Sequence, residues 1–360
     1  MRRLLLASLS AAAILSLASC GQQKPQQTQS CNAQEFCESD FDTTGNKIAD
    51  EPAKVPTIFT TLNENPPKVA ALHVSGSQLL NENGEPVQLR GMSFGWHNWH
   101  GQFFNETVVH RLTTEWNISI IRCPMGVGPN NDYLKNPENA YKCVDNIVKA
   151  AINEGIYVII DWHSHQMKLN EARYFFGKMA EKYGRYPNVI FEIFNEPIDH
   201  SWDELKNYGE QIVAEIRKYT DNIVLMGCPK WDQMINEPAA RPLNGVSNVM
   251  YTVHFYAGTH KQELRDRAEK AINDGCPVFL SEYGAMDASG DGALNYEEWD
   301  KWIKWADSKN ISWIAWSISD KNETCSILNN GASPDASTWT DADLKEYGLA
   351  CRKLLQSYKK

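Results

Sequence analysis

Short apolar runs and longer segments with a helical period alternate along the chain from residue 69 onward. The runs are rich in β-branched and aromatic side chains, which is typical of buried strands. In the segments between them, apolar residues recur every three or four positions, and this predicts amphipathic helices. We expect strands at Leu89–Phe94, Ile118–Met125, Ile156–His163, Val189–Asn195, Ile223–Gly227, Val249–Tyr256, Val278–Tyr283 and Ile311–Ile318.

Helices are expected between most of these strands, and a last helix closes the chain. Between the fifth and sixth strands, Pro238 and Pro242 interrupt the helical pattern. Ahead of the first strand, Leu72–Val74 and Val87–Leu89 flank Asn83-Gly84, which predicts a β-hairpin with its turn at that pair. The expected helices are Thr107–Trp116, Ala140–Glu154, Asn170–Tyr183, Trp202–Tyr219, Gln262–Asn273, Tyr296–Ser308 and Asp341–Tyr358.

This alternation of strands and helices indicates an α/β fold with a parallel sheet. The number of strands fits a (β/α)8 TIM barrel whose base is covered by the short N-terminal β-hairpin. The alternative is an open, doubly wound sheet, which would carry a glycine-rich phosphate loop after its first strand. Here the second half of that strand and the residues after it, 91–99, are rich in aromatic side chains. The barrel is therefore favoured.

The N-terminus begins Met1-Arg2-Arg3 and continues with an apolar run to Leu17, which is the pattern of a secretory signal. The run ends in 17–20, Leu-Ala-Ser-Cys, which resembles the cleavage box of bacterial lipoproteins, where the cysteine carries lipid. An ordinary signal peptide with a chance cysteine is the alternative. We expect a lipoprotein signal peptide at residues 1–19, a lipid on Cys20, and a location at the outer membrane or cell surface.

Residues 20–68 are rich in Gln and Pro and show little apolar periodicity, which predicts a flexible tether. Residues 69–360 would then form one catalytic domain. Eight cysteines remain besides Cys20, and their pairing cannot be deduced from sequence. They contain no Cys-x-x-Cys pair, so a zinc ribbon has no support, and we expect neither a metal nor a cofactor.

The composition narrows the class of protein further. The formal charge of −10 argues against nucleic acid as a partner. The hydrophobic fraction of 42% is enough to fill a core. No apolar run reaches the roughly 18–20 residues that a membrane span needs, so a membrane-spanning bundle is excluded. The 12 tryptophans are many for this length, and Trp either fills cores or stacks on flat ligands.

Polar and aromatic residues stand where the predicted strands end. In a TIM barrel, the carboxyl ends of the strands carry the catalytic residues. Each of these residues alone could be structural, but together they place two glutamates, Glu196 and Glu282, on one rim. Two such carboxylates suit glycoside hydrolysis, and a nearby Arg122 would keep one of them ionised. The residues at this rim are Arg122, Asp161, His163, Asn195, Glu196, Trp231, His254, Tyr256, Glu282 and Trp316.

At these positions the sequence resembles glycoside hydrolase family 5. Ile193–Pro197 resembles the acid/base motif of that family, and Leu280–Gly284 resembles its nucleophile motif. Further matches follow in family order over about residues 69–357, and the chain is most similar to the bacterial endo-β-1,4-glucanases (cellulases). The other matching segments are Leu89–Ser93, Ile121–Arg122, Asp161–His163, His254–His260 and Trp316–Glu323.

The resemblance implies a role for each residue at the catalytic centre. Glu196 would be the general acid/base and Glu282 the nucleophile of a retaining hydrolase, with their carboxyls ~5–5.5 Å apart. Asn195 would bind the 2-hydroxyl of the sugar. Arg122 and Tyr256 would hold Glu282 ionised and oriented. His163 and His254 would complete the polar floor around the −1 sugar.

The resemblance also implies substrate-binding residues for a β-glucan. Trp316 would be the platform beneath the −1 sugar, and Trp99 and Trp231 would stack on neighbouring glucosyl units. Lys321 and Glu323 resemble residues that bind the non-reducing side. We expect a monomer that cuts internal bonds. The alternatives are a mixed-linkage glucanase, xylanase or mannanase of the same family, or a non-catalytic glycan-binding lipoprotein, against which the presence of both glutamates argues.

One position departs from the family pattern, and one loop resembles a different kind of site. Many relatives carry a histidine where Gly95 stands, and here His97 lies beyond it, which puts the binding geometry of that loop in doubt. Residues 287–298 fit most of the EF-hand calcium spacing, but they follow a strand rather than a helix, so we expect a rim loop. Four further tryptophans are expected to pack the core rather than bind sugar: Trp299, Trp302, Trp305 and Trp313.

Overall fold

The computed structural model describes residues 53–358. The predicted signal peptide at 1–19, the lipid on Cys20, and the tether as far as residue 52 lie outside the described residues, as do Cys31 and Cys37. None of the helices within 53–358 has the length and hydropathy needed to cross a membrane.

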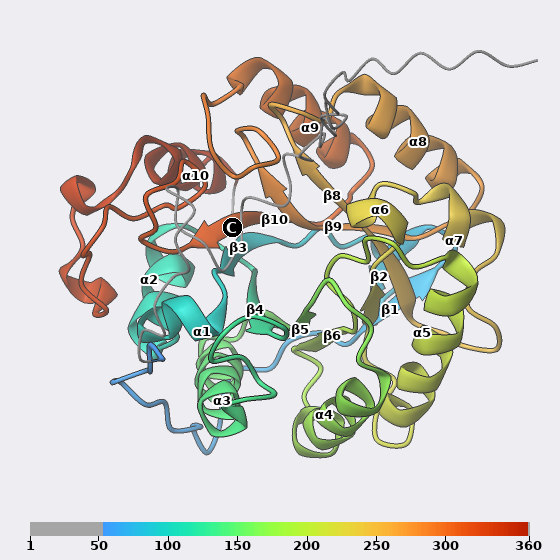
Figure 1. The fold of residues 1–360 in the computed structure, drawn as a ribbon, viewed down its shortest axis with the longest axis horizontal. Helices are drawn as coiled ribbons and strands as arrows, with labels where there is room; N and C mark the ends of the chain where they lie inside the picture. The colour runs from blue at the N-terminus through green and yellow to red at the C-terminus, as the bar shows by residue number, and fades with distance from the viewer. Residues whose placement is uncertain (1–52, 359–360) are drawn as a thin grey trace, which may run out of the picture. The chain divides into compact units, whose positions relative to one another are not determined.

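Eight parallel strands close into a barrel, in which the last strand pairs with the first (Figure 1). This closure confirms the predicted (β/α)8 barrel and excludes an open doubly wound sheet, because a closed barrel has no edge strand. The strands begin and end close to their predicted positions. In barrel order they are β10 Trp313–Ile318, β3 Arg90–Phe94, β4 Ile120–Gly126, β5 Tyr157–His163, β6 Val189–Glu192, β7 Val224–Met226, β8 Val249–Tyr256 and β9 Val278–Gly284.

The helices surround the barrel on the outside (Figure 1). Several begin at side chains that cap free backbone N–H groups, as Asn105 does for α2 and Ser201 with Glu204 does for α5. The helices are α1 His97–His100, α2 Glu106–Glu115, α3 Pro137–Glu154, α4 Leu169–Tyr183, α5 Trp202–Ile216, α6 Pro229–Asp232, α7 Asn236–Ala240, α8 Gln262–Asn273, α9 Tyr296–Ser308 and α10 Glu346–Gln356.

Two helical predictions differ from the structure. The last helix, expected from Asp341, begins at Glu346, because Asp341–Asp343 forms a separate 3-10 turn with Thr340 as its cap. Between β7 and β8, where the prolines weaken the helical pattern, only the short α6 and α7 form.

The N-terminal hairpin exists, but the prediction of its turn is wrong. Strands β1 Leu72–Ser75 and β2 Gln78–Asn81 pair across a loop that contains Gly76, whose φ is +57°. Glycine adopts this left-handed conformation without steric cost, which makes the tighter loop possible. Asn83-Gly84 forms a second turn after β2. Leu72 and Leu79 pack with the residues at the amino ends of the strands, so the hairpin covers the base of the barrel as expected.

Residues 53–68, which the sequence assigns to the flexible tether, lie against α3 instead. Asn139, Asn146 and Asn153 are spaced seven residues apart, so they share one face of that helix. Their side-chain amides bind backbone groups of residues 53–68, and Thr60 among these is buried. The packed domain therefore begins before residue 69. The bonds run from Asn139 Nδ2 to Lys54 O (3.3 Å), Asn146 Nδ2 to Ile58 O (2.9 Å), Thr60 N to Asn146 Oδ1 (3.1 Å), Asn153 Nδ2 to Thr61 O (2.8 Å) and Asn63 N to Asn153 Oδ1 (2.8 Å).

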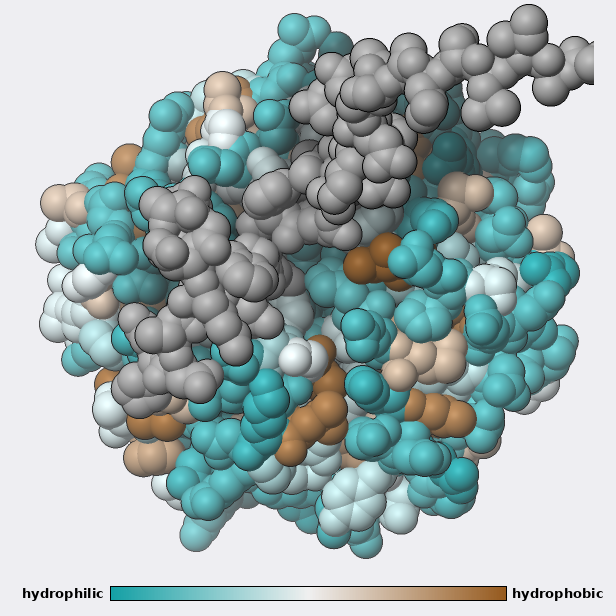
Figure 2. Space-filling model, viewed as in Figure 1, coloured by the Kyte–Doolittle hydropathy of each residue, from teal (hydrophilic) through white to brown (hydrophobic). Residues whose placement is uncertain are grey.

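The interior is apolar, and the surface in view is mainly hydrophilic. Figure 2 shows hydrophobic residues as small separate patches among hydrophilic ones. As predicted, Trp299, Trp302 and Trp313 are buried, and Trp305 packs partly against the core. The six cysteines within the described residues are buried free thiols: Cys123, Cys143, Cys228, Cys276, Cys325 and Cys351.

Candidate active site

Arg122 organises the floor of the site inside the barrel. It projects from β4 and is fully buried. Its Nη1 donates to Oε2 of Glu282 (2.8 Å) and its Nε to Oε2 of Glu192 (2.7 Å). Its Nη2 donates to Oδ1 of Asn195 (2.6 Å) and lies 2.9 Å from Oδ2 of Asp161. One guanidinium thus contacts three carboxylates, an arrangement that its planar fork of donors makes possible.

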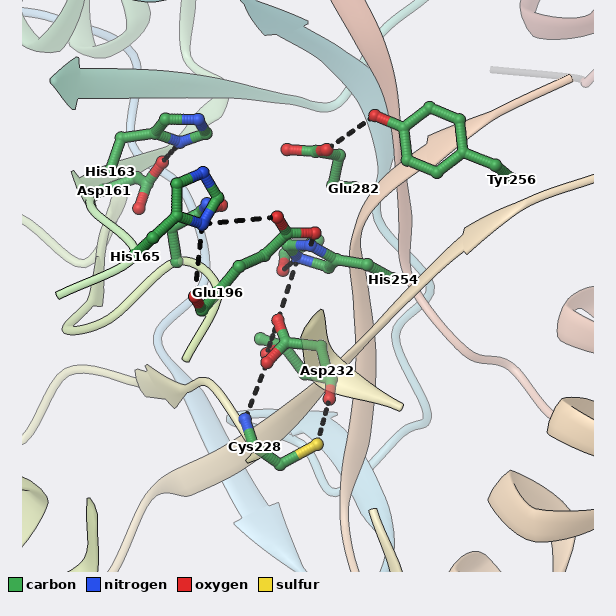
Figure 3. A network of polar contacts seen from close by, with 12 residues as sticks. Asp161, His163, His165, Glu196, Cys228, Asp232, His254, Tyr256 and Glu282 are labelled. Carbon is green, nitrogen blue, oxygen red and sulfur yellow. Dashed lines mark hydrogen bonds and ion pairs between the residues drawn. The ribbon is translucent and has the colours of Figure 1, made fainter. Parts of the chain in front are cut away.

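Glu282 is held at both of its carboxylate oxygens. Oε2 binds Arg122, and Oε1 accepts a hydrogen bond from the Tyr256 hydroxyl at 2.7 Å (Figure 3). The residue is nearly buried, at 4% exposure, yet it lines the pocket. A carboxylate held in this way by a guanidinium and a hydroxyl points in one direction. Arg122 and Tyr256 are the two residues that the sequence analysis expected beside Glu282.

Glu196 has a different set of neighbours. Its Oε1 lies 2.8 Å from Nδ1 of His254, and its Oε2 lies 3.7 Å from Nδ1 of His165. Burial alone would raise the pKa of Glu196, but the hydrogen bond and charge of His254 lower this pKa to about 2. In the free protein, the proton of this pair therefore lies on the His254 side of the hydrogen bond.

The two glutamates face each other across a short gap. One oxygen of Glu196, one of Glu282 and a ring nitrogen of His254 all lie within 4.8 Å of one another. Oxygens this close favour the ~5–5.5 Å separation between carboxyl groups of retaining glycosidases over the ~6.5–9.5 Å of inverting ones. A cation could reach the same three atoms, but both carboxylates are already compensated by Arg122, Tyr256 and His254.

His163 lies directly behind Trp316, stacked on its ring. The two rings stack at a centroid distance of 5.1 Å and an interplanar angle of 4°. His163 Nδ1 lies 2.6 Å from Oδ2 of Asp161, which fixes the ring, and the Trp96 ring is perpendicular to the His163 ring at a centroid distance of 4.4 Å. Trp316 lines the pocket.

All five substrate-binding residues expected from the sequence line the same pocket as Glu196 and Glu282. Lys321 and Glu323 form an ion pair at its edge, with Nζ and Oε1 2.5 Å apart. The sequence reasoning did not single out Trp96 for the lining, although Trp96 lies in the aromatic run at residues 91–99. The expected residues are Trp99, Trp231, Trp316, Lys321 and Glu323, and the additional ones include Trp96, Ser317, Ser319, Cys325 and Ser326.

Of the three histidines His97, His100 and His165, one is structural and two line the pocket. His97 is buried and accepts a hydrogen bond from the Gly126 N–H at Nδ1 (2.8 Å). Burial lowers the pKa of His97 to about 3, so it is neutral and structural. His100 and His165 line the pocket, where a sugar could reach them.

Two further buried carboxylates were missed by the sequence reasoning. Glu192 ends β6 and accepts hydrogen bonds from Arg122 and from the Ser281 hydroxyl (2.6 Å). Asp232 lies at the end of α6, with Oδ2 3.2 Å from Nε2 of His254. A charged residue at the end of an otherwise apolar strand could have identified Glu192, but nothing local marks Asp232.

The loop at residues 287–298 uses its acidic side chains elsewhere. Glu298 binds Arg265 Nη1, and Asp291 Oδ1 accepts a hydrogen bond from the Thr324 hydroxyl at 2.8 Å. Both carboxylates would be calcium ligands in an EF-hand loop, but here they bind protein groups instead.

The chain is similar to known proteins over most of its length. Residues 80–322 match the family described as "Cellulase (glycosyl hydrolase family 5)". An endoglucanase of Clostridium saccharobutylicum is 39% identical over 84% of this chain, and endoglucanase A of Evansella cellulosilytica is 40% identical over 76%. The chain spans 70% and 57% of the lengths of these two relatives.

A solved structure shares both the fold and part of the sequence. The catalytic domain of a Thermobifida fusca endoglucanase, determined as a variant in complex with cellotetraose, superimposes with a TM-score of 0.76 at 31% identity. The match covers 79% of this chain and 97% of that domain.

Proposed function

The chain belongs to glycosyl hydrolase family 5, and from this premise we propose that it is a retaining endo-β-1,4-glucanase. The observation that carries the proposal is the pair Glu196 and Glu282, whose carboxylate oxygens lie within 4.8 Å of each other in a pocket lined by tryptophans. The relatives named endoglucanases, and the related domain solved with cellotetraose, support a β-glucan as substrate.

In the first step, an oxygen of Glu282 attacks the anomeric carbon and forms a covalent ester. The bond between that carbon and the glycosidic oxygen breaks, and its electron pair goes to the departing oxygen, which takes the proton from Glu196. Tyr256 and Arg122 support this attack because their hydrogen bonds to the two carboxylate oxygens orient Glu282. The ring between the two residues develops positive charge, which the buried carboxylates stabilise.

In the second step, Glu196 acts as the base. It takes a proton from a water molecule whose oxygen attacks the anomeric carbon, and the ester bond breaks with its electron pair returning to Glu282. Two inversions leave the configuration of the anomeric carbon unchanged. Asn195, held by Arg122, is placed to bind the sugar 2-hydroxyl during both steps.

The substrate is proposed from the shape and chemistry of the pocket. Trp99, Trp231 and Trp316 offer flat apolar surfaces, which suit the C–H faces of an equatorial glucan. A panel of soluble glucans, xylans and mannans separates the remaining candidates, and cleavage of mannan alone would overturn the β-1,4-glucan assignment. The non-catalytic alternative is disfavoured because both carboxylates are present and close together.

The variant Glu196→Gln tests the acid/base. Loss of a general acid should lower kcat on cello-oligosaccharides by about 10²–10⁴-fold, because the leaving oxygen then departs unprotonated. Reducing-sugar release measures this effect, and proton NMR of the wild-type reaction should show the β anomer first. Asp199→Asn, at an exposed position, is the control and should keep its activity. An α anomer as the first product, or full activity of Glu196→Gln, would refute the mechanism.

We further propose that the enzyme is exported and anchored by lipid at Cys20, on the strength of the N-terminal sequence. Cells that express the full chain should incorporate labelled fatty acid into the wild type and not into Cys20→Ala. Equal labelling of both proteins would show that Cys20 is not the site of lipid attachment.

A further inference from the structure

Asp232 is a fully buried carboxylate that the mechanism above does not use. Its Oδ2 lies 3.2 Å from Nε2 of His254, and Nδ1 of the same ring lies 2.8 Å from Oε1 of Glu196. Figure 3 shows the three side chains in one line, from Asp232 through His254 to Glu196. We refer to Asp232, His254 and Glu196 as the acid chain.

An unusual backbone turn brings Asp232 into this position. Lys230, Trp231 and Asp232 have φ of 60°, 53° and 61°, a left-handed conformation that is unfavourable for residues other than glycine. The turn is held by hydrogen bonds from Cys228 N to Asp232 Oδ1 (2.6 Å) and from Trp231 N to Pro197 O (3.0 Å). The same turn thus places Trp231 in the pocket lining and Asp232 against His254.

The surroundings of His254 are acidic on both sides. Glu196 faces Nδ1, while Nε2 lies near Asp232, Ser281 (2.9 Å) and Glu192 (3.9 Å). Glu282 and His260 interact with the ring through space. The Thr252 hydroxyl also donates to Oδ2 of Asp232 at 2.7 Å.

These neighbours favour the retention of a proton. Burial lowers the pKa of His254, but its acidic neighbours, Asp232 first among them, raise it well above its ordinary value. Burial also raises the pKa of Asp232 well above its usual range. Because both pKa values are raised, the acid chain retains a proton at neutral pH.

We propose that Asp232 is a positioning residue for the general acid: through Nε2 of His254, it orients the ring towards Glu196 and retains the proton that the leaving sugar needs. The inference rests on the proposed role of Glu196. With Nε2–H between the Ser281 hydroxyl oxygen (2.9 Å) and the charged Asp232 carboxylate (3.2 Å), the ring keeps its second proton on Nδ1, from which it can move to Oε1 of Glu196. Glu196 then gives it to the glycosidic oxygen, and the water of the second step returns a proton to Glu196.

This role predicts a pH effect with a definite sign. The groups of the acid chain titrate together, so a negative charge on any of them raises the pH at which the chain loses its proton. Asp232→Asn keeps the size of the side chain and removes this charge. The alkaline limb of the kcat/KM profile should therefore move to lower pH, by about one unit or more.

A matched variant separates positioning from a merely structural role. Asp132 is buried like Asp232 and likewise accepts hydrogen bonds in a turn, in its case from Gly128 N (2.6 Å) and Lys135 N (3.0 Å), but it lies on the loop after β4. Asp132→Asn should lower the melting temperature without moving the pH profile. Asp232→Asn should move the profile whatever its melting temperature.

Leaving-group dependence supplies a second readout. Dinitrophenolate departs without protonation, so Asp232→Asn should change kcat/KM for dinitrophenyl β-cellobioside by less than about threefold, against about tenfold or more for cellotetraose. If the pH profile of Asp232→Asn did not move and kcat/KM fell equally on both substrates, Asp232 would only hold the turn, and the proposal would be overturned. Failure of the proposed function would show differently, as a wild type inactive on glucans or a fully active Glu196→Gln.

Discussion

Glu282→Gln should abolish hydrolysis of cello-oligosaccharides while leaving their binding intact. Glutamine has the same shape, but its amide cannot form the ester with the anomeric carbon. Loss of the nucleophile in other covalent enzymes lowers kcat on the order of 10⁶-fold, and we expect a loss of that size here. Reducing-sugar release measures turnover, and calorimetric titration with cellotetraose measures binding.

The effect on stability serves as the internal control for this variant. Arg122 keeps its contacts with Glu192, Asp161 and Asn195 when Glu282 becomes neutral, so the melting temperature should change little. Turnover within tenfold of the wild type would show that Glu282 is not the nucleophile.

Arg122→Met should lower the free energy of unfolding by about 3–5 kcal/mol at pH 7, the cost of leaving buried charges without a partner. Arg122 is the shared cation for Glu282, Glu192 and Asp161, and the side chains of Arg122, Glu192 and Asp161 have no exposed surface. Denaturant unfolding monitored by tryptophan fluorescence measures the loss. Arg173→Met removes a half-exposed ion pair with Glu215 and should change stability by about 1 kcal/mol or less.

The loss caused by Arg122→Met should depend on pH. Burial would raise the pKa of Glu192, but Arg122 and His254 hold this pKa at about 2. A carboxylate with a lowered pKa stabilises the fold above its unfolded value of ~4.3, and this contribution disappears as the pH falls towards about 2. The gap between wild type and variant should therefore narrow between pH 4.5 and pH 2. A constant gap, or a loss below about 1 kcal/mol at pH 7, would contradict the ion-pair account.

Much of the fold could be predicted because it depends on local patterns. The eight barrel strands and most helices follow from apolar periodicity, which records how each element buries one face. Predictions failed where two turn signals lie close together in the sequence, or where a segment is held by hydrogen bonds to residues far along the chain. Asn83-Gly84 is a strong turn signal, yet Gly76 forms the hairpin loop. Residues 53–68, which lack apolar periodicity, pack because the side chains of Asn139, Asn146 and Asn153, far along the chain, bind their backbone groups.

The sequence by itself predicted the kind of fold and placed the two glutamates on one rim, because the carboxyl ends of strands in a parallel barrel converge. Glu282 lies near the carboxyl end of β9, and Glu196 lies four residues beyond the end of β6. Only the tertiary structure decided the electrostatics around them. The contacts of Arg122 with Glu192 and of His254 with Asp232 join different strands and loops, and their strength depends on burial. The left-handed turn at Asp232 contains no glycine that would predict it from the sequence. Besides the local bond from Cys228 N, it is held by the Thr252 hydroxyl of β8, a contact that forms only in the tertiary structure.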